Sequence, residues 1–227
     1  MAGFIRRVID KTTSAFERLV SGIHSFICSL NEWIERINRH GTYITAIEES
    51  TPVYAPEVVD IKLAEELKHG FDELACGELV AHMQKMTPQE RATFIEQTFL
   101  PLVASKMAVS YDEFEWFEQE EVRTCGYYNH SEQKIALNKA FIASDDNRVI
   151  TILLNTVIHE CKHARQWAAV EGADLGYSQQ LLDEWKQNFE DYISPKESDE
   201  GYIKQPVEFD AAGFANSIID ERVIFEK

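Results

Sequence analysis

The segment from about Asn147 to Val170 most constrains how this 227-residue chain can fold. Asp145 or Asp146 precedes it, and an aspartate in this place is typical of a helix N-cap. The following residues are strongly apolar and supply the buried face of a helix: Ile152, Leu153, Leu154, Val157 and Ile158. We therefore predict a long helix packed inside a globular domain, and the hydrophobic fraction of 44% is enough to fill such a core.

This predicted helix contains the sequence His159-Glu160-Cys161-Lys162-His163. Histidines four positions apart lie on one face of a helix, so both imidazoles can bind one metal ion at about 2.0–2.1 Å. Glu160 is placed to take a proton from a metal-activated water. Lys162 is unusual, because the two middle positions of this motif are normally uncharged, and Cys161 is expected to pack as a small apolar residue. The alternative is an ordinary helix with two surface histidines.

A catalytic zinc site normally has three protein ligands, so a third ligand is expected elsewhere. The candidate is Glu208, in the first turn of a helix predicted from Val207 to about Arg222. Small residues let that helix approach the histidine helix: Ala211, Ala212, Gly213 and Ala215. Glu208 would complete a His₂Glu site for one zinc ion per chain. Two alternatives stay open: Asp210 as the ligand or as a partner of a ligand, and Glu208 as a solvated acid that favours the helix dipole.

Two motifs resemble those of the gluzincin group of zinc peptidases. The first is HExxHxxQ, which ends at Gln166, and the second is QPxExDAxxFA, which contains Glu208. The second motif is similar to the third-ligand helix of the CAAX-prenyl-protease family and to the corresponding segment of ImmA/IrrE-type regulatory peptidases. Together the motifs suggest small bacterial or phage-like minigluzincins, over roughly residues 120–222. Several gluzincins have Asp or Asn four residues after the ligand glutamate, where this chain has Ala212.

The resemblance implies a zincin-like fold in which the glutamate at the position of Glu208 binds zinc. In such families an edge strand before the active-site helix binds the peptide by strand addition. The expected edge strand consists of Gln133, Lys134, Ile135, Ala136 and Leu137. Candidates for stabilising the oxyanion are Tyr177, Tyr192 and Tyr202. Minigluzincins are often latent, and either residues 1–56 or Ile218–Lys227 is the hypothetical blocking segment.

The predicted order of elements is helices, a small antiparallel sheet and further helices, which defines an α+β fold. The sheet is predicted from a hairpin, in which Asn129–Gln133 joins Glu121–Tyr128 to Lys134–Leu137. A polar, proline-containing loop is expected between Tyr192 and Pro206. The other predicted helices are Glu57–Met86, one that opens with a capping box at Thr87–Glu90, and Ser178–Tyr192.

Residues 1–40 form a separate region in this interpretation. Two apolar series at heptad spacing predict a long amphipathic helix: Ile9, Phe16, Ile23, Leu30 and Ile37, with Ile5, Thr12, Leu19, Phe26 and Trp33. This region holds six basic and four acidic residues, a net charge of +2, which leaves −19 for residues 41–227. Residues 41–56 read as a linker and residues 57–227 as the metallopeptidase domain. The apolar face of this predicted helix, over residues 5–37, is expected to pack on that domain, to self-associate, or to contact a partner or a membrane.

The formal charge of −17 argues against nucleic acid as a partner and leaves a peptide or protein as the expected substrate. The four cysteines form no CxxC pair, and no export signal or membrane span is recognisable, so we expect reduced thiols and a cytoplasmic protein. We predict a zinc-dependent endopeptidase with Glu160 as general base and then acid. The alternatives are a catalytically weak zincin-fold module with a structural zinc, which would not need Glu160, and a peripheral membrane or envelope protein.

Overall fold

The computed structural model describes residues 54–75, 78–118 and 124–219, and all of them belong to one compact unit. The predicted heptad helix of residues 1–40 and nearly all of the linker of residues 41–56 lie outside these described residues. Most of the segment Ile218–Lys227 lies outside them as well. Self-association through residues 5–37 and the blocking segment therefore stay predictions.

The described chain begins with two helices, α2 (Val58–Ala75) and α3 (Leu79–Gln84). The sequence had predicted one helix over Glu57–Met86, and that prediction is wrong. Glu78, the N-cap of α3, has φ −120° and ψ 48°, which is not a helical conformation, so the helix does not continue through this residue.

The next helical run consists of α4 (Pro88–Phe94), a π-helical turn (Ile95–Phe99) and α5 (Leu100–Lys106). It starts with the predicted capping box. The Glu90 backbone N–H donates to the Thr87 hydroxyl at 3.3 Å, and the Thr87 N–H donates to the Glu90 carboxylate at 2.8 Å. These two bonds satisfy backbone donors that the first helical turn leaves without partners.

The sheet of the described residues has three strands, β1 (Glu113–Phe117), β2 (Gly126–Asn129) and β3 (Lys134–Asn138), in the order β1-β3-β2. β2 and β3 form the predicted antiparallel hairpin, whereas β1 pairs with β3 in parallel. The prediction of an antiparallel sheet is therefore wrong, because the sheet is mixed. β1 is followed by β2 on the opposite side of β3, so no tight turn forces β1 into an antiparallel pairing.

β3 is the central strand, so the prediction that Gln133–Leu137 forms a substrate-binding edge strand is wrong. The β3 backbone pairs with β1 on one side and with β2 on the other, which leaves no free ladder for a peptide. Its residues Ile135, Ala136 and Leu137 are fully buried, as in strands covered on both faces. Three consecutive apolar residues were the sequence signal for such a strand. In the described residues the antiparallel edge is β2.

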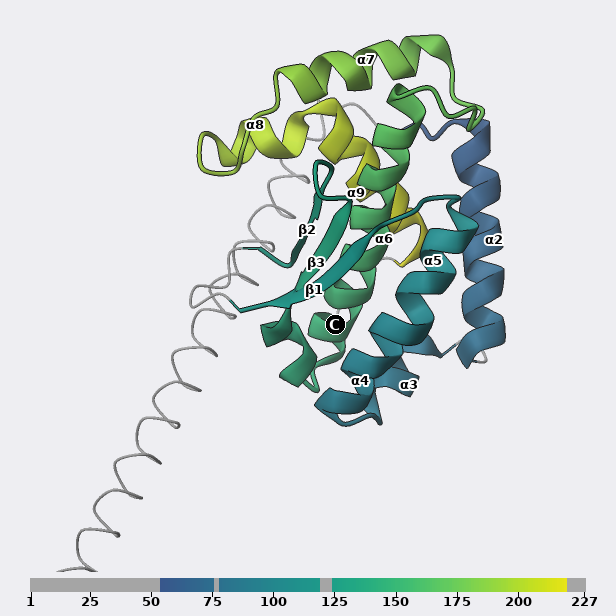
Figure 1. Cartoon of the computed structure of the whole chain (residues 1–227). Helices are drawn as coiled ribbons and strands as arrows, with labels where there is room; N and C mark the ends of the chain where they lie inside the picture. Colours follow the sequence, from purple (N-terminus) through teal and green to yellow (C-terminus); the bar gives the residue numbers. More distant parts are fainter. Residues whose placement is uncertain (1–53, 76–77, 119–123, 220–227) are drawn as a thin grey trace, which may run out of the picture. The chain divides into compact units, whose positions relative to one another are not determined.

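Helix α6 (Asn147–Val170) spans the residues that the sequence predicts. Asp146 is its N-cap and accepts a hydrogen bond of 2.9 Å from the Arg148 N–H. α6 contacts β2 and β3, and it also contacts α9 (Pro206–Ile218), so it forms the centre of the described unit (Figure 1). The remaining elements are a 3₁₀ helix (Lys139–Ala143), α7 (Gln179–Glu190) after its N-cap Ser178, and α8 (Asp199–Lys204). α8 occupies part of the segment that was predicted as a polar loop.

A fully buried arginine fixes the start of α6 against the earlier helices. Arg91 of α4 donates to the carbonyl oxygens of Met83, Ile142 and Ser144 at distances of 2.7–2.9 Å. Its guanidinium also pairs with Asp145, just before α6. A buried guanidinium needs several acceptors, and these four supply them. This Arg91 clamp therefore ties residues 142–145, just before α6, to α3 and α4.

The described residues follow the predicted order of helices, sheet and helices, which confirms an α+β arrangement. Within this described part, none of the helices combines the length and the apolar composition needed to cross a bilayer.

Candidate metal centre

His159, His163 and Glu208 come together between α6 and α9. The histidines lie one turn apart on α6, and Glu208 lies in the first turn of α9. The two Nε2 atoms are 3.0 Å apart, and each lies 3.2 Å from an oxygen of the Glu208 carboxylate. The three residues that the sequence predicted as ligands therefore form one group that can hold a metal ion.

The spacing of these donor atoms fits a tetrahedral ion. Ligands at about 2.0–2.1 Å from a tetrahedral zinc lie about 3.3 Å from one another. The observed separations of 3.0–3.2 Å are close to that value. Two Nε2 atoms at 3.0 Å repel each other when both present lone pairs or both present hydrogens, and a shared cation removes that repulsion.

Burial and mutual attraction shift the pKa values of these ligands. Burial raises the pKa of Glu208, but His163 and His159 outweigh it and hold that pKa well below its usual range. Burial lowers the pKa of His163, but Glu208, Glu160 and the hydrogen bond to Gln166 together raise it to about 9. A metal ion bound at these atoms would have to displace the proton of His163, because proton and metal compete for the same atoms.

Glu160 follows His159 and is 6% exposed. Burial raises the pKa of its carboxyl, against the opposing effect of the two histidines. The backbone N–H of Tyr128 in β2 donates to the same carboxylate. A buried carboxyl with a raised pKa beside a metal-ion site is suited to the role of a general base.

Strand β2 approaches α6 closely because it begins with a glycine. A Cβ atom at Gly126 would lie 2.7 Å from the Thr156 Cγ2 atom and 2.8 Å from the Ala136 carbonyl oxygen, both far inside van der Waals contact. Any side chain at Gly126 would therefore push β2 away from α6. Since Thr156 lies one turn before Glu160, the glycine also sets the distance between β2 and the Glu160 carboxyl. Sequence reasoning did not find this residue.

Asp210 is not one of the donors in the metal-ion group. Its Oδ2 atom instead accepts a hydrogen bond of 2.8 Å from the side-chain amide of Gln166. The Gln166 Oε1 atom lies 2.8 Å from Nδ1 of His163. Asp210 therefore reaches His163 only through Gln166, and it is neither a donor in the metal-ion group nor a direct hydrogen-bond partner of a histidine.

The three predicted tyrosines fall in two different places. The Tyr192 hydroxyl donates to Glu208 Oε1 at 2.6 Å, and the Tyr202 hydroxyl also bonds to Glu208. Burial and the nearby Glu208 carboxylate raise the pKa of both phenols, so both stay protonated donors. The Tyr177 hydroxyl lies in a separate cluster, where it donates to Asp60 at 2.7 Å. The expectation that Tyr177 belongs to the site is wrong, because its hydroxyl is held by that cluster.

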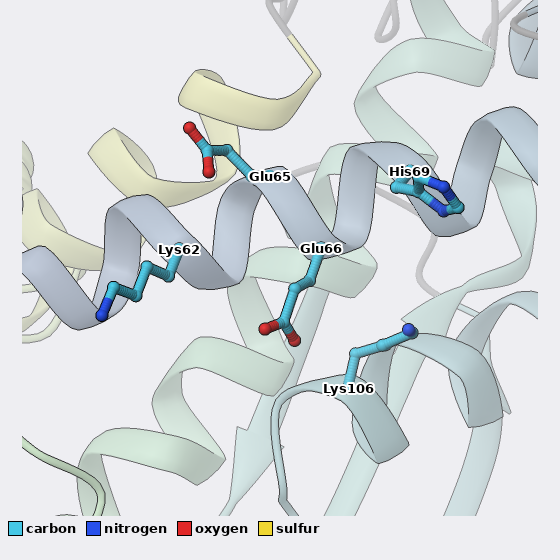
Figure 2. Close-up of a pocket in the computed structure, with 5 residues that line it drawn as sticks. All are labelled: Lys62, Glu65, Glu66, His69 and Lys106. Carbon is cyan, nitrogen blue, oxygen red and sulfur yellow. The ribbon is translucent and has the colours of Figure 1, made fainter.

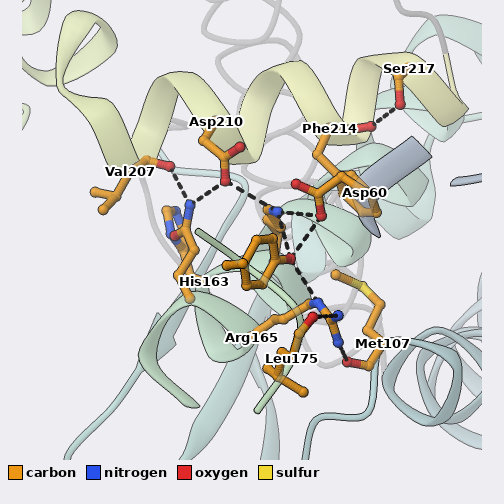
Figure 3. Close-up of polar contacts among 12 residues, drawn as sticks. Asp60, Met107, His163, Arg165, Leu175, Val207, Asp210, Phe214 and Ser217 are labelled. Carbon is orange, nitrogen blue, oxygen red and sulfur yellow. Dashed lines mark hydrogen bonds and ion pairs between the residues drawn. The ribbon is translucent and has the colours of Figure 1, made fainter. Parts of the chain in front are cut away.

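The cluster around Tyr177 is centred on Lys162, the unusual residue of the histidine motif. Lys162 is fully buried, and its ammonium lies 2.8 Å from Asp60, 3.0 Å from the Tyr177 hydroxyl and 3.3 Å from Asp210. Figure 3 shows Asp60 and Asp210 approaching this point from different elements, with Arg165 on the far side. Burial opposes the positive charge, but the neighbouring acids outweigh it and raise the pKa of Lys162. The sequence analysis did not identify Asp60 of α2 as a partner of Lys162.

A surface pocket of about 380 Å³ lies between α2 and α5 (Figure 2). Its lining residues are exposed and of both charges: Lys62, Glu65, Glu66, His69 and Lys106. None of them belongs to the metal-ion group. Mixed, solvated charges of this kind are typical of a protein surface.

Comparison of the chain with protein-family models, with curated proteins and with solved structures found no match. The functional interpretation therefore depends on the residues of the site and on their geometry.

Proposed function

We propose that this protein is a zinc-dependent endopeptidase of the gluzincin type with a zincin-like fold. The observation that carries the proposal is the group of His159, His163 and Glu208, with donor atoms 3.0–3.2 Å apart and the buried Glu160 beside them. Two imidazoles and one carboxylate are a ligand set that catalytic zinc sites use, and three protein ligands leave one position for water or substrate. A site that is only structural has no need of Glu160.

The chemistry divides between the ion and the protein. Zinc, when bound by the three ligands, would supply a Lewis acid that activates water and polarises the scissile carbonyl. Glu160 would take the proton from the attacking water and then give it to the leaving amine. The raised pKa of Glu160 supports both steps, since a carboxyl that holds its proton more strongly is a better base and can carry the proton until the amine departs.

The backbone of β2 provides a place for an extended peptide. The Cys125 carbonyl oxygen accepts a hydrogen bond from the Asn138 N–H at 2.7 Å. In an antiparallel pair, Cys125 and every second residue after it therefore direct their backbone hydrogen bonds toward β3. The backbone groups of Gly126 and Tyr128 consequently face away from β3. We propose that the substrate adds to β2, which replaces the earlier assignment to residues 133–137.

Tyr192 is the proposed stabiliser of the oxyanion. Its hydroxyl lies 2.6 Å from Glu208 Oε1, which places a neutral donor beside the ligand group. Because the residue is 42% exposed, we propose that its hydroxyl exchanges Glu208 for a substrate oxygen during the reaction. Tyr202 is the second candidate, because its hydroxyl also contacts Glu208.

Metal analysis of the purified full chain by mass spectrometry tests the site. At saturating zinc we expect about one zinc per chain in the parent and in Asp210→Ala, and loss of zinc in Glu208→Ala. Hydrolysis of a mixed peptide library by the zinc-loaded parent, with Glu160→Gln as the matched control, then tests the activity. Absence of bound zinc in the parent would contradict the proposal, whereas bound zinc without hydrolysis would favour the alternative module with a structural zinc.

A further inference from the structure

A continuous line of buried polar contacts connects Lys162 to His163, although the two side chains leave α6 in different directions. The Asp210 Oδ2 atom forms an ion pair with the Lys162 ammonium at 3.3 Å and accepts a hydrogen bond from the Gln166 amide at 2.8 Å. Gln166 then contacts His163. Lys162 and Gln166 are fully buried and Asp210 is 9% exposed, so water competes little for these bonds.

The surroundings of Gln166 allow only one orientation of its amide. The NH₂ group donates to the Val207 carbonyl oxygen at 3.0 Å and to Asp210 Oδ2 at 2.8 Å (Figure 3). Rotating the amide by half a turn would place its oxygen against a carbonyl and a carboxylate, which are both acceptors. The Gln166 Oε1 atom must therefore face Nδ1 of His163.

This orientation fixes which nitrogen of His163 is free for a metal. An amide oxygen only accepts, so the Nδ1 atom at 2.8 Å must carry the hydrogen. In the neutral imidazole the lone pair then lies on Nε2, the atom that faces His159 and Glu208. Val207 and Asp210 thus determine the tautomer of His163 through Gln166, without a hydrogen bond of their own to His163.

Lys162 keeps Asp210 in the required place. Its ammonium can donate three hydrogen bonds, and the three acceptors around it are Asp60, Tyr177 and Asp210. Without that cation, Asp210 and Asp60 would be two buried carboxylates without a compensating lysine. The acceptor that holds the Gln166 amide would then no longer be fixed.

We propose that Lys162 and Asp210 are positioning residues of the metal centre, which act by fixing the Gln166 amide and through it the Nε2-binding tautomer of His163. The proposal rests on the proposed function, because it assumes that His159, His163 and Glu208 bind zinc. It assigns a role to Lys162, the charged residue at one of the two middle positions of the histidine motif, and it joins α2, α6 and α9 to the geometry of a single ligand.

The test measures the zinc dissociation constant of the full chain by competition with a chelating dye. We expect Gln166→Met to weaken zinc binding about 10–100-fold and Asp210→Ala about 10-fold. Asp210→Asn should restore most of the affinity, because its amide oxygen can still accept from Gln166. Leu100→Ala, a fully buried position on α5, is the matched control: its melting temperature should fall while its zinc affinity stays within about twofold of the parent.

NMR of the histidine side chains distinguishes an effect on the His163 tautomer from a general loss of stability. In the zinc-loaded parent, ¹⁵N NMR of the imidazoles should show His163 bound through Nε2 with a slowly exchanging Nδ1 hydrogen, and Asp210→Ala should lose that slow exchange. Equal zinc affinity and unchanged spectra in Gln166→Met and Asp210→Ala would overturn the positioning role while leaving the zinc site intact. Weaker binding in Leu100→Ala, in proportion to its lost stability, would also overturn it. A parent chain that binds no zinc would overturn the proposed function and this inference with it.

Discussion

Replacing Lys162 with methionine removes a buried charge and keeps most of the side chain. Methionine has an unbranched stem of similar length, so packing against the three aromatic rings around the ammonium is largely retained. The ammonium that is lost lies 2.8 Å from Asp60 and 3.3 Å from Asp210, and none of the Lys162 side chain is exposed. The substitution therefore isolates the electrostatic part of this cluster.

Breaking a buried ion pair by removing one partner costs about 3–5 kcal/mol. Here one ammonium lies against two carboxylates, so we expect Lys162→Met to lower the free energy of unfolding by about 4–5 kcal/mol. Urea denaturation of the metal-free protein at pH 7.5, followed by circular dichroism, measures this loss. The double variant Lys162→Met with Asp60→Asn removes one of the two unpaired charges, and we expect it to recover about 1–3 kcal/mol.

The loss of unfolding free energy caused by Lys162→Met should be smaller at lower pH. Burial raises the pKa of Asp210, and Lys162 opposes that rise, so the pKa of Asp210 in the folded variant is higher still. The folded variant then binds more protons than its unfolded chain, which makes its stability increase as the pH falls. We expect the effect of Lys162→Met to be smaller at pH 5 than at pH 8 by about 1 kcal/mol or more. If Lys162→Met lowers the free energy of unfolding by less than about 1 kcal/mol at pH 7.5, or by an amount that does not change with pH, the conclusion that Lys162 compensates the charges of Asp60 and Asp210 is refuted.

Three further predictions address the site and the fold. Glu160→Gln should lower peptide hydrolysis by roughly 10²–10⁴-fold with one zinc per chain still bound, because glutamine cannot take up the proton; retained activity would exclude Glu160 as the base. Because Glu208, with smaller contributions from Glu160 and Gln166, raises the pKa of His163 to about 9 against the effect of burial, the stability that the protonated His163 gives the metal-free protein should be complete below about pH 6.5 and lost as the pH rises through about 9. Glu208→Gln should greatly weaken that pH dependence in urea titrations, and an unchanged profile would mean that the pair of His163 and Glu208 does not form. Arg91→Met should lower the free energy of unfolding by about 3 kcal/mol, since it leaves buried carbonyl oxygens unpaired, and a loss within about 0.5 kcal/mol would contradict the clamp.

Local rules predicted the parts of the structure that local interactions determine. The N-cap at Asp146 and the apolar run behind it gave the limits of α6, and the capping box at Thr87 gave the start of α4. The hairpin of β2 and β3 followed from two strand-like segments and a short polar connection. The grouping of Glu208 with the two histidines was also predicted, from the expectation that a shared metal ion needs three ligands at one point and from the motif resemblance.

Features that depend on distant parts of the chain were not predictable in this way. Asp60 and Lys162 are 102 residues apart, and nothing near Asp60 marks it as the partner of a buried lysine. The parallel pairing of β1 with β3 depends on the path of the intervening chain, and strand propensity carries no information about that path. Lys162 itself was a signal, because an ammonium in an otherwise buried helix must have acidic partners somewhere in the fold.

Helix α9 presents two acids to α6, and the pairing of each supports the other. Glu208 lies against the histidines, while Asp210 lies against Gln166 and Lys162. A movement of α9 that withdrew Glu208 from the ligand group would also separate Asp210 from a fully buried ammonium, which is strongly unfavourable in an interior of low dielectric constant. The Lys162 cluster therefore holds Glu208 in register before any metal arrives. For the proposed zinc site, such preorganisation would increase the affinity for the ion, because the ordering of the ligands is complete in the folded protein.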